Sequence, residues 1–180
     1  MTLREAAAEL AEAAARLDEA ALEPTVRAIL DARRVMLYGC GREGLMMQAL
    51  AMRLHHLGRS VCMQSDMAAF PLGPGDLFLC AAGPGELATA SALCRVATAA
   101  GARVLVVTAE PQGATAALAD DLLVIPAQTM AHDRAGTSVL PMGSLFEGAM
   151  FLVFEVLVLR LREALGQTAE SMRPRHTNME

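Results

Sequence analysis

Five short apolar runs alternate with helical segments along this chain, and this alternation is the strongest constraint on its fold. The runs are apolar without a polar residue at every second position, as in Val35–Tyr38, which is typical of strands buried on both faces of a parallel sheet. We expect strands at residues 35–38, 60–63, 76–81, 104–107 and 122–125. The alternation predicts an α/β fold: a three-layer α/β/α sandwich around a five-stranded parallel sheet.

The segments between these runs carry apolar residues at helical spacing. Two of them, residues 3–17 and 24–30, precede the first strand, so residues 1–32 are expected to form an N-terminal helical extension. Residues 33–180 are expected to form a single domain. Its helices are predicted at residues 42–57, 86–100, 114–119 and 143–165, and residues 126–141 are expected to form a loop.

The composition excludes several classes of function. All 15 basic residues are arginine, so no lysine is available for a Schiff base, for pyridoxal phosphate or for a Walker-type phosphate loop. A net charge of −5 and an aromatic content of 3 % argue against nucleic-acid binding, which needs a basic face and stacking side chains. The expected ligand is therefore a small molecule.

Cysteine usage and hydropathy indicate the cellular compartment of the protein. The four cysteines, at positions 40, 62, 80 and 94, form no Cys-x-x-Cys pair, which favours reduced thiols over a metal or disulfide framework. The N-terminal segment lacks the apolar core of a signal peptide. The most apolar stretch, residues 145–161, carries three charged residues, so we predict a buried helix rather than a membrane span. We expect a cytoplasmic protein.

Two glycine-rich loops follow the first and third expected strands, Gly39–Gly44 and Ala82–Glu86. Ligands of open parallel sheets bind beyond the carboxyl ends of the strands, where amides at helix starts face the ligand. We expect these loops to line the site, although glycine also serves tight turns alone. The first loop matches G-x-G-x-x-G, and Asp66 lies 22 residues after it, so dinucleotide binding stays an alternative.

Five stretches of the chain, which together span nearly all of it, carry a family resemblance. They are Tyr38–Arg42, Ala51–Gly58, Gly75–Leu77, Leu140–Glu147 and Arg175–Asn178. In these stretches the chain resembles the sugar isomerase (SIS) domain, and within it the 6-phospho-3-hexuloisomerase family. The resemblance implies a flavodoxin-like SIS fold and a homotetramer that interconverts 3-hexulose 6-phosphate and fructose 6-phosphate. It implies no metal and no organic cofactor.

Both glycine-rich loops depart from the family pattern. Glu43 stands where the family has serine. The second loop of the family reads Ser-Gly-Ser-Gly, then a charged residue and a hydroxyl, and the resemblance implies that these hydroxyls bind phosphate. Here the stretch is Ala82–Leu87, in which Pro84 lacks an amide N–H. A phosphate beside Glu43 would meet like-charge repulsion. We therefore favour an altered ligand, such as a non-phosphorylated, amino or otherwise less anionic sugar.

The other expected binding residues follow from the same comparison. Arg42 is expected to offset the charge of Glu43, and Thr89 is a surviving hydroxyl. Asp66 takes the place of a family glutamate after the second strand and is expected to contact sugar hydroxyls. Alternatively, Glu43 and Glu86 are first-turn helix residues that face water. The candidate substrate-binding residues are Gly41, Arg42, Glu43, Asp66, Gly83, Pro84, Gly85, Glu86 and Thr89.

The chemistry implied by the family moves one proton between neighbouring carbons through an enediol, which needs a base above both carbons. By the resemblance Glu147 is this base, and His176 assists from a neighbouring subunit. The alternative for Glu147 is a capping box with Ser144, in which the helix terminus lowers its pKa. The alternative for His176 is a frayed tail.

The remaining histidines give weaker signals. His55 and His56 are expected at a subunit contact or in the core, and the His132-Asp133 pair is a candidate lid. The methionines are expected to serve adaptable packing at a subunit contact. We predict a sugar or sugar-phosphate isomerase; the alternative is a non-catalytic module that binds or senses a sugar derivative.

Overall fold

The computed structural model describes residues 2–133 and 138–179. Its centre is a parallel sheet with strand order β2-β1-β3-β4-β5. The strands are β1 (Val35–Tyr38), β2 (Val61–Met63), β3 (Leu77–Ala81), β4 (Arg103–Thr108) and β5 (Asp121–Val124). Each lies within one residue of its prediction, because the apolar runs are bounded by polar residues and glycines.

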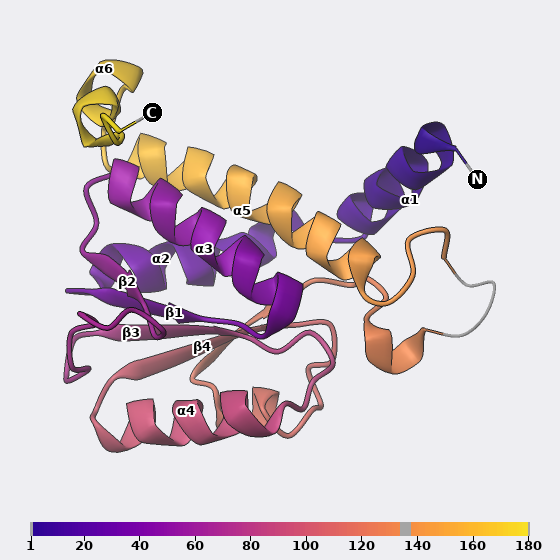
Figure 1. Cartoon of the computed structure of the whole chain (residues 1–180), viewed down its shortest axis with the longest axis horizontal. Helices are drawn as coiled ribbons and strands as arrows, with labels where there is room; N and C mark the ends of the chain where they lie inside the picture. Colours follow the sequence, from indigo (N-terminus) through magenta and orange to yellow (C-terminus); the bar gives the residue numbers. More distant parts are fainter. Residues whose placement is uncertain (1, 134–137, 180) are drawn as a thin grey trace.

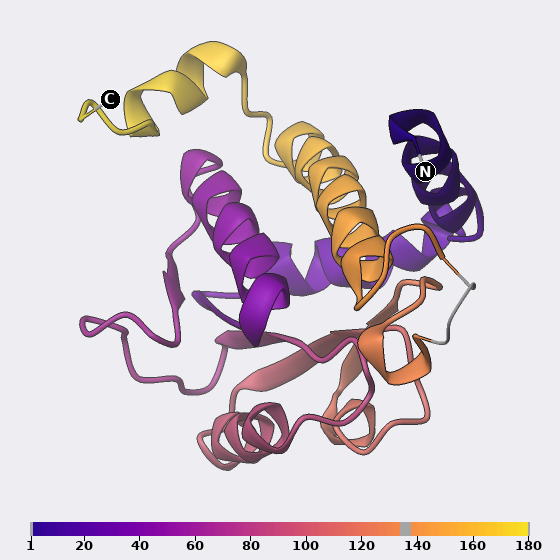
Figure 2. The ribbon, with the colours of Figure 1, turned by 45° about the vertical axis from the view of Figure 1, so that its right-hand side comes forward.

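Helices cover both faces of the sheet, which confirms the predicted three-layer sandwich (Figures 1 and 2). One face carries α1 (Leu3–Ala15), α2 (Glu23–Asp31), α3 (Gly41–His56) and α5 (Ser144–Ala164), and the other carries α4 (Ala88–Ala99). The C-terminal segment, α6 (Ala169–Met172) and the 3₁₀ helix η4 (Arg173–Arg175), lies beyond the end of α5.

Each strand contributes to two hydrophobic cores. Leu37, Leu79 and Leu105 pack toward α3 and α5, whereas Phe78 and Val104 pack toward α4. Both faces of the central strands are therefore buried, which explains why their sequences show no polar alternation.

The strand order places the functional loops. The chain leaves β1 toward β2 at one edge of the sheet and returns to β3 on the other side of β1. Ligand sites of such sheets lie where the connections diverge, outside the carboxyl ends of β1 and β3. The loops at residues 39–44 and 82–87 start at this point.

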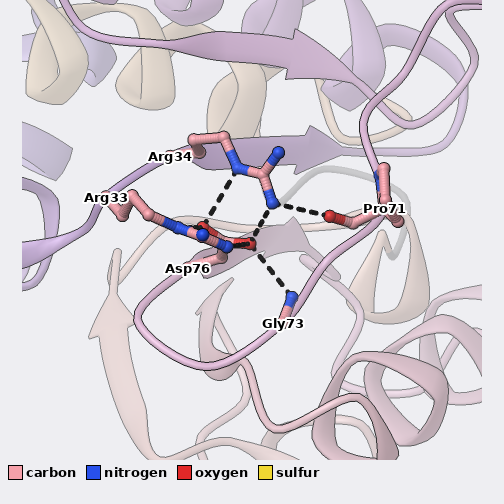
Figure 3. Close-up of polar contacts among 5 residues, drawn as sticks. All are labelled: Arg33, Arg34, Pro71, Gly73 and Asp76. Carbon is pink, nitrogen blue, oxygen red and sulfur yellow. Dashed lines mark hydrogen bonds and ion pairs between the residues drawn. The ribbon is translucent and has the colours of Figure 1, made fainter.

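A buried carboxylate holds together the amino ends of β1 and β3, which are opposite to the carboxyl ends that carry the loops (Figure 3). The fully buried Asp76, just before β3, accepts hydrogen bonds from the guanidinium groups of Arg33 and Arg34 and from the amide of Gly73. These donors hold the pKa of Asp76 well below its ordinary value, with the Arg34 hydrogen bond as the largest cause. The cluster ties the entry of β1 to the entry of β3.

Three helical predictions need correction. The helix expected at 114–119 is only a 3₁₀ helix, η2 (Ala116–Leu118), because the amides of Leu118 and Ala119 bond to carbonyls three residues earlier, those of Thr115 and Ala116. The helix expected from residue 86 begins at Ala88. The loop expected at 126–141 contains the 3₁₀ helix η3 (Met130–His132), and its residues 134–137 lie outside the described part.

Two helical segments were not predicted, the 3₁₀ helix η1 (Glu19–Leu22) and the C-terminal pair α6 and η4. In η1 Asp18 caps the amide of Ala20, a short-range polar signal inside an alanine-rich stretch. In α6 the hydroxyl of Thr168 accepts from Ser171, a capping box with serine in place of the usual Glu or Gln.

Candidate active site

The first turn of α3 follows β1 without a side-chain cap, so its free amides face the carboxyl edge of the sheet. Gly39 and Gly44 let the strand end touch the helix start: a Cβ on Gly44 would lie 2.6 Å from the Gly39 carbonyl oxygen. This close approach accounts for two of the three glycines in the G-x-G-x-x-G match.

Glu43 reaches from α3 to the next loop. Its Oε2 accepts a hydrogen bond from the Gly83 amide (3.0 Å), and the residue is only 8 % exposed. Burial raises its pKa to about 7, the Gly83 hydrogen bond opposes this rise, and the charge of Glu147 adds to it. The alternative in which Glu43 faces water is wrong, because the Gly83 loop lies opposite the first turn of α3. Glu86 is exposed, as that alternative expected, but it precedes α4 and does not lie in its first turn.

Glu147 lies on the first turn of α5 and pairs with Arg42. The Arg42 Nε lies 2.8 Å from Glu147 Oε2, Nη1 donates to Ser144 Oγ (2.7 Å), and Nη2 donates to the Met142 carbonyl. The capping box does not form, because the N-cap of α5 is Gly143 and not Ser144. Burial raises the pKa of Glu147, and Arg42 opposes this. The lowering expected from the helix terminus is therefore outweighed.

The turn before α5 has a left-handed backbone. Met142 has φ 55° and Gly143 has φ 84°, and the Ser144 amide closes the turn onto the Pro141 carbonyl (3.1 Å). Asp133 accepts from the Met142 amide, while Arg42 donates to its carbonyl. The Pro-Met-Gly sequence signals a turn, but the role of Asp133 in holding it was not predicted. The lid function of His132-Asp133 stays a prediction; His132 pairs with Glu110 (3.1 Å).

The second loop is also tightly packed. Gly83 lies under Glu43 and Phe146: a Cβ on it would be 2.6 Å from Glu43 Oε1 and from a Phe146 ring carbon. Gly85 closes a turn onto the Ala82 carbonyl (2.9 Å). Thr89 is exposed at the start of α4, and Pro84 is partly exposed. A role for Phe146 was not predicted.

Asp66 and Gly41 lie at the periphery of this group. Gly41 begins α3 with φ 54° and has open space around its Cβ position. The exposed Asp66 follows the edge strand β2, and its carboxylate accepts from the Met63 amide (2.8 Å). A contact of Asp66 with sugar hydroxyls stays a prediction.

His176 lies at the other end of α3. Its ring stacks on the buried His56 with centroids 5.1 Å apart, and Arg175 donates to the His56 carbonyl (3.0 Å). His55 is exposed. An open hollow of about 470 Å³ lies here, and its polar lining is Arg53, His56, Arg162, Arg173 and His176.

The distance between the two ends follows from helix geometry. Arg42 and His56 are 14 residues apart in α3, which at 1.5 Å per residue separates them by roughly 20 Å. One chain therefore does not bring Glu147 and His176 together.

The chemistry available at the carboxyl edge is that of two carboxylates and one guanidinium. Burial raises the pKa of both carboxyl groups, that of Glu43 to about 7, and such shifts concentrate at sites that bind or react. Within the described residues no group of His, Cys, Asp and Glu is arranged to hold a metal ion. In the same part of the chain no helix is long and apolar enough to span a membrane.

Together the topology and this charged group define an α/β protein of flavodoxin-like strand order with its candidate site at the switch point. The model of the SIS domain family matches residues 28–152. The chain is also 35 % identical over 154 residues to 3-hexulose-6-phosphate isomerase of Mycobacterium gastri, covering 86 % of this chain and 77 % of the relative. The chain therefore belongs to the SIS domain family, and the resemblance stated from the sequence is confirmed.

Solved structures confirm the fold. A hypothetical protein from Methanococcus jannaschii, for which a function as 3-hexulose-6-phosphate isomerase was inferred, superposes with a TM-score of 0.85 at 20 % identity over 99 % of this chain and 98 % of that one. The sugar isomerase domain of the RpiR transcription factor from Sphaerobacter thermophilus has a TM-score of 0.73 at 18 % identity, over 96 % and 92 % of the chains. At these identities the likeness concerns the fold alone.

Proposed function

We propose that this chain is an isomerase of the 6-phospho-3-hexuloisomerase type that acts on a sugar or sugar phosphate, with a changed loop at residues 82–87. The observation that carries the proposal is the pairing of Glu147 with Arg42 at the topological switch point. The similarity to the Mycobacterium gastri isomerase supports the reaction class.

In the proposed mechanism Glu147 takes a proton from the carbon next to the sugar carbonyl. The electron pair of that C–H bond forms the enediol double bond, and the carbonyl oxygen gains negative charge. Arg42, which already donates three hydrogen-bonding contacts at this site, stabilises that charge. Glu147 then returns the proton to the former carbonyl carbon. The hydroxyl proton of the carbon that lost its C–H proton passes to the charged oxygen, so that this carbon becomes the new carbonyl. Burial raises the pKa of Glu147 above its ordinary value, which is the direction that makes a carboxylate a stronger base.

His176 enters this mechanism only from a second copy of the chain, because it lies roughly 20 Å from Arg42 along α3. A homotetramer or dimer would bring it to a neighbouring site. An apolar face on α3 and α5 supports such an assembly, since large exposed patches of this kind mark contact surfaces. Its residues are Leu45, Met52, Phe151, Leu152, Val156 and Leu159.

The test is solvent-proton exchange followed by NMR in deuterated water with fructose 6-phosphate and with fructose. We expect deuterium at carbon 3, and at least a 100-fold slower exchange in Glu147→Gln. The matched control is Glu155→Gln, which changes a glutamate on the same helix two turns away. Equal exchange in Glu147→Gln and wild type would sink the assigned base, and exchange at carbon 1 would move the reaction to an aldose–ketose isomerisation.

A second candidate function is a non-catalytic module that binds a sugar derivative. It is favoured by the shared fold with a transcription-factor domain and by the contact with Arg42, which opposes the rise that burial causes in the pKa of Glu147 and so makes it a weaker base in the free protein. The Glu147→Gln variant separates the two functions: an enzyme loses turnover and keeps affinity for the sugar, whereas a binding module shows no exchange in either form.

A further inference from the structure

The loop between β3 and α4 has the position of an anion-binding loop, but most of its amides already donate within the protein. Three of them donate inside the protein: Gly83 to Glu43 Oε2 (3.0 Å), Gly85 to the Ala82 carbonyl (2.9 Å) and Leu87 to Thr115 Oγ1 (3.1 Å). Pro84 has no amide N–H. A loop binds an oxyanion through several amides that converge on it, and this loop cannot supply such a set without breaking its own contacts.

Glu43 and Phe146 also fill the space above Gly83. A single added methyl on Gly83 would come within 2.6 Å of both side chains. An anion that approached the Gly83 amide would therefore have to displace a buried carboxylate that already bonds to it. The carboxyl group of Glu43 therefore occupies the position that an anion would take.

The charges around Glu43 also disfavour a bound phosphate. The one guanidinium of the group, Arg42, is already paired with Glu147 (2.8 Å), so it does not offset Glu43 as well. The neighbouring His132 is paired with Glu110. A phosphate dianion would add two negative charges to a group that holds two carboxylates and one guanidinium. A sugar hydroxyl adds none, and it can donate to a carboxylate and accept from a guanidinium.

We infer that Glu43 is a specificity-determining residue. Its carboxyl group takes the position that an anion would have in the 82–87 loop. The end of the sugar that enters this loop therefore carries a free hydroxyl and not a phosphate. The inference deepens the proposed function, on which its exchange readout rests, by naming unphosphorylated sugars as the substrate class.

The first measurement is binding, because it does not depend on turnover. The full chain is titrated with matched pairs, fructose against fructose 6-phosphate and glucose against glucose 6-phosphate, with inorganic phosphate as a third probe. Thermal shift and calorimetry report the affinity. We expect the unphosphorylated partner of at least one pair to bind at least tenfold more tightly than its phosphate, and inorganic phosphate to compete weakly.

The second measurement changes Glu43. The Glu43→Ser variant frees the Gly83 amide and removes a charge, and Glu43→Gln removes the charge while keeping the shape. We expect Glu43→Ser to move the affinity ratio toward the phosphorylated partner by at least tenfold, and Glu43→Gln by less. Glu163→Gln, which changes an exposed glutamate of α5, is the matched control and should leave the ratio unaltered.

Three outcomes overturn the inference: a wild type that binds the phosphorylated partner as well as or better than the free sugar, a panel in which no unphosphorylated sugar binds, or folded Glu43 variants whose ratio equals that of the wild type. The failure of the proposed function looks different. In that case free sugars bind with the expected preference, but no deuterium enters them. The wild-type ratio needs no variant, so a Glu43→Ser protein that fails to fold does not block the test.

Discussion

Two buried carboxylates, Asp76 and Glu43, lie at opposite ends of the strands, which we call the amino edge and the carboxyl edge of the sheet, and their surroundings differ. At the amino edge Asp76 accepts hydrogen bonds from Arg33 and Arg34 (Figure 3). At the carboxyl edge Glu43 accepts one amide hydrogen bond and lies near the charge of Glu147. The pKa of Asp76 is held well below its ordinary value, mainly by the Arg34 hydrogen bond, whereas burial raises that of Glu43 to about 7.

This difference in donors distinguishes a carboxylate that stabilises the fold, Asp76, from one that is a candidate binding group, Glu43. Asp76 has two cations for one negative charge, so its ionised form is stable and it links two strand entries. The ionised form of Glu43 is unfavourable because the side chain is buried, and residues with pKa values shifted in this way are concentrated at binding and catalytic sites. Burial alone therefore does not identify a functional carboxylate; the balance of donors around it does.

The largest effect is expected at the amino edge. Asp76→Ala leaves Arg33 and Arg34 without their buried partner, so we expect a loss of about 3–5 kcal/mol in the free energy of unfolding, measured by urea denaturation. The control is Asp121→Ala, which breaks the more exposed pair with Arg103 and should cost about 1 kcal/mol or less. Equal losses in the two variants would contradict this assignment.

The pH dependence of Asp76 has a definite sign. Its folded-state pKa is below the ordinary value of 3.8, so its stabilisation is complete above that pH and is lost as the pH falls further. We expect the wild type to lose stability below pH 4 and Asp76→Asn to lack this acid limb. An acid limb of the same size in both proteins would assign it to other carboxylates.

Glu43→Gln should act in the opposite direction. The pKa of Glu43, about 7 in the folded state against an ordinary 4.5, gives a stabilisation that is complete below pH 4.5 and is lost as the pH rises through 7. At pH 8 the variant should therefore be more stable than the wild type by about 2–3 kcal/mol, and near pH 4 the two should be equal. Urea melts at both pH values check this. A variant that is less stable at pH 8 would place Glu43 with Asp76 as a structural group.

Gly83→Ala tests the packing at the carboxyl edge. Its methyl would clash with Glu43 Oε1 and with the Phe146 ring, so we expect a loss of about 2 kcal/mol and a displaced Glu43. Gly73→Ala is the control at the amino edge, where the closest atom is 3.9 Å away, and it should change stability by less than about 0.5 kcal/mol. Calorimetric melting of both variants measures the contrast, and equal stabilities would mean that Gly83 is not confined.

Much of the fold was predictable because strand identity follows from local composition. The runs around Val35 and Val104 are apolar on both faces, and the glycines at 58 and 101 end helices where expected. The C-terminal segment was missed because it is polar and is held by long-range contacts with His56, a hydrogen bond from Arg175 and the stacked ring of His176. The family comparison confirmed the membership of the SIS domain family and the solved structures confirmed the fold, whereas the site residues remain predictions.

The geometry of the candidate site was less predictable, because it depends on which loops meet across the sheet. An acid in the first turn of a helix ordinarily faces water, and the sequence contains no local sign that Gly83 lies opposite Glu43. In the same way, Ser144-x-x-Glu147 has the spacing of a capping box, but Arg42, about 100 positions earlier, takes the carboxylate. Contacts between distant segments decided both cases.

The smallest effect concerns backbone strain, which also differs between the two edges. At the amino edge the left-handed position before Asp76 is occupied by Gly75 (φ 81°), whereas at the carboxyl edge Met142 adopts φ 55°. A side chain is strained in this region, and such strain persists where neighbouring contacts hold it, here from Arg42 and Asp133. We expect Met142→Gly to raise the free energy of unfolding by up to about 1 kcal/mol and Gly75→Ala to lower it by a similar amount. Urea denaturation measures both.

If the strain serves to position the Met142 carbonyl for Arg42, Met142→Gly will also slow deuterium exchange. A stabilised variant with unchanged exchange would show that the strain has no part in the reaction.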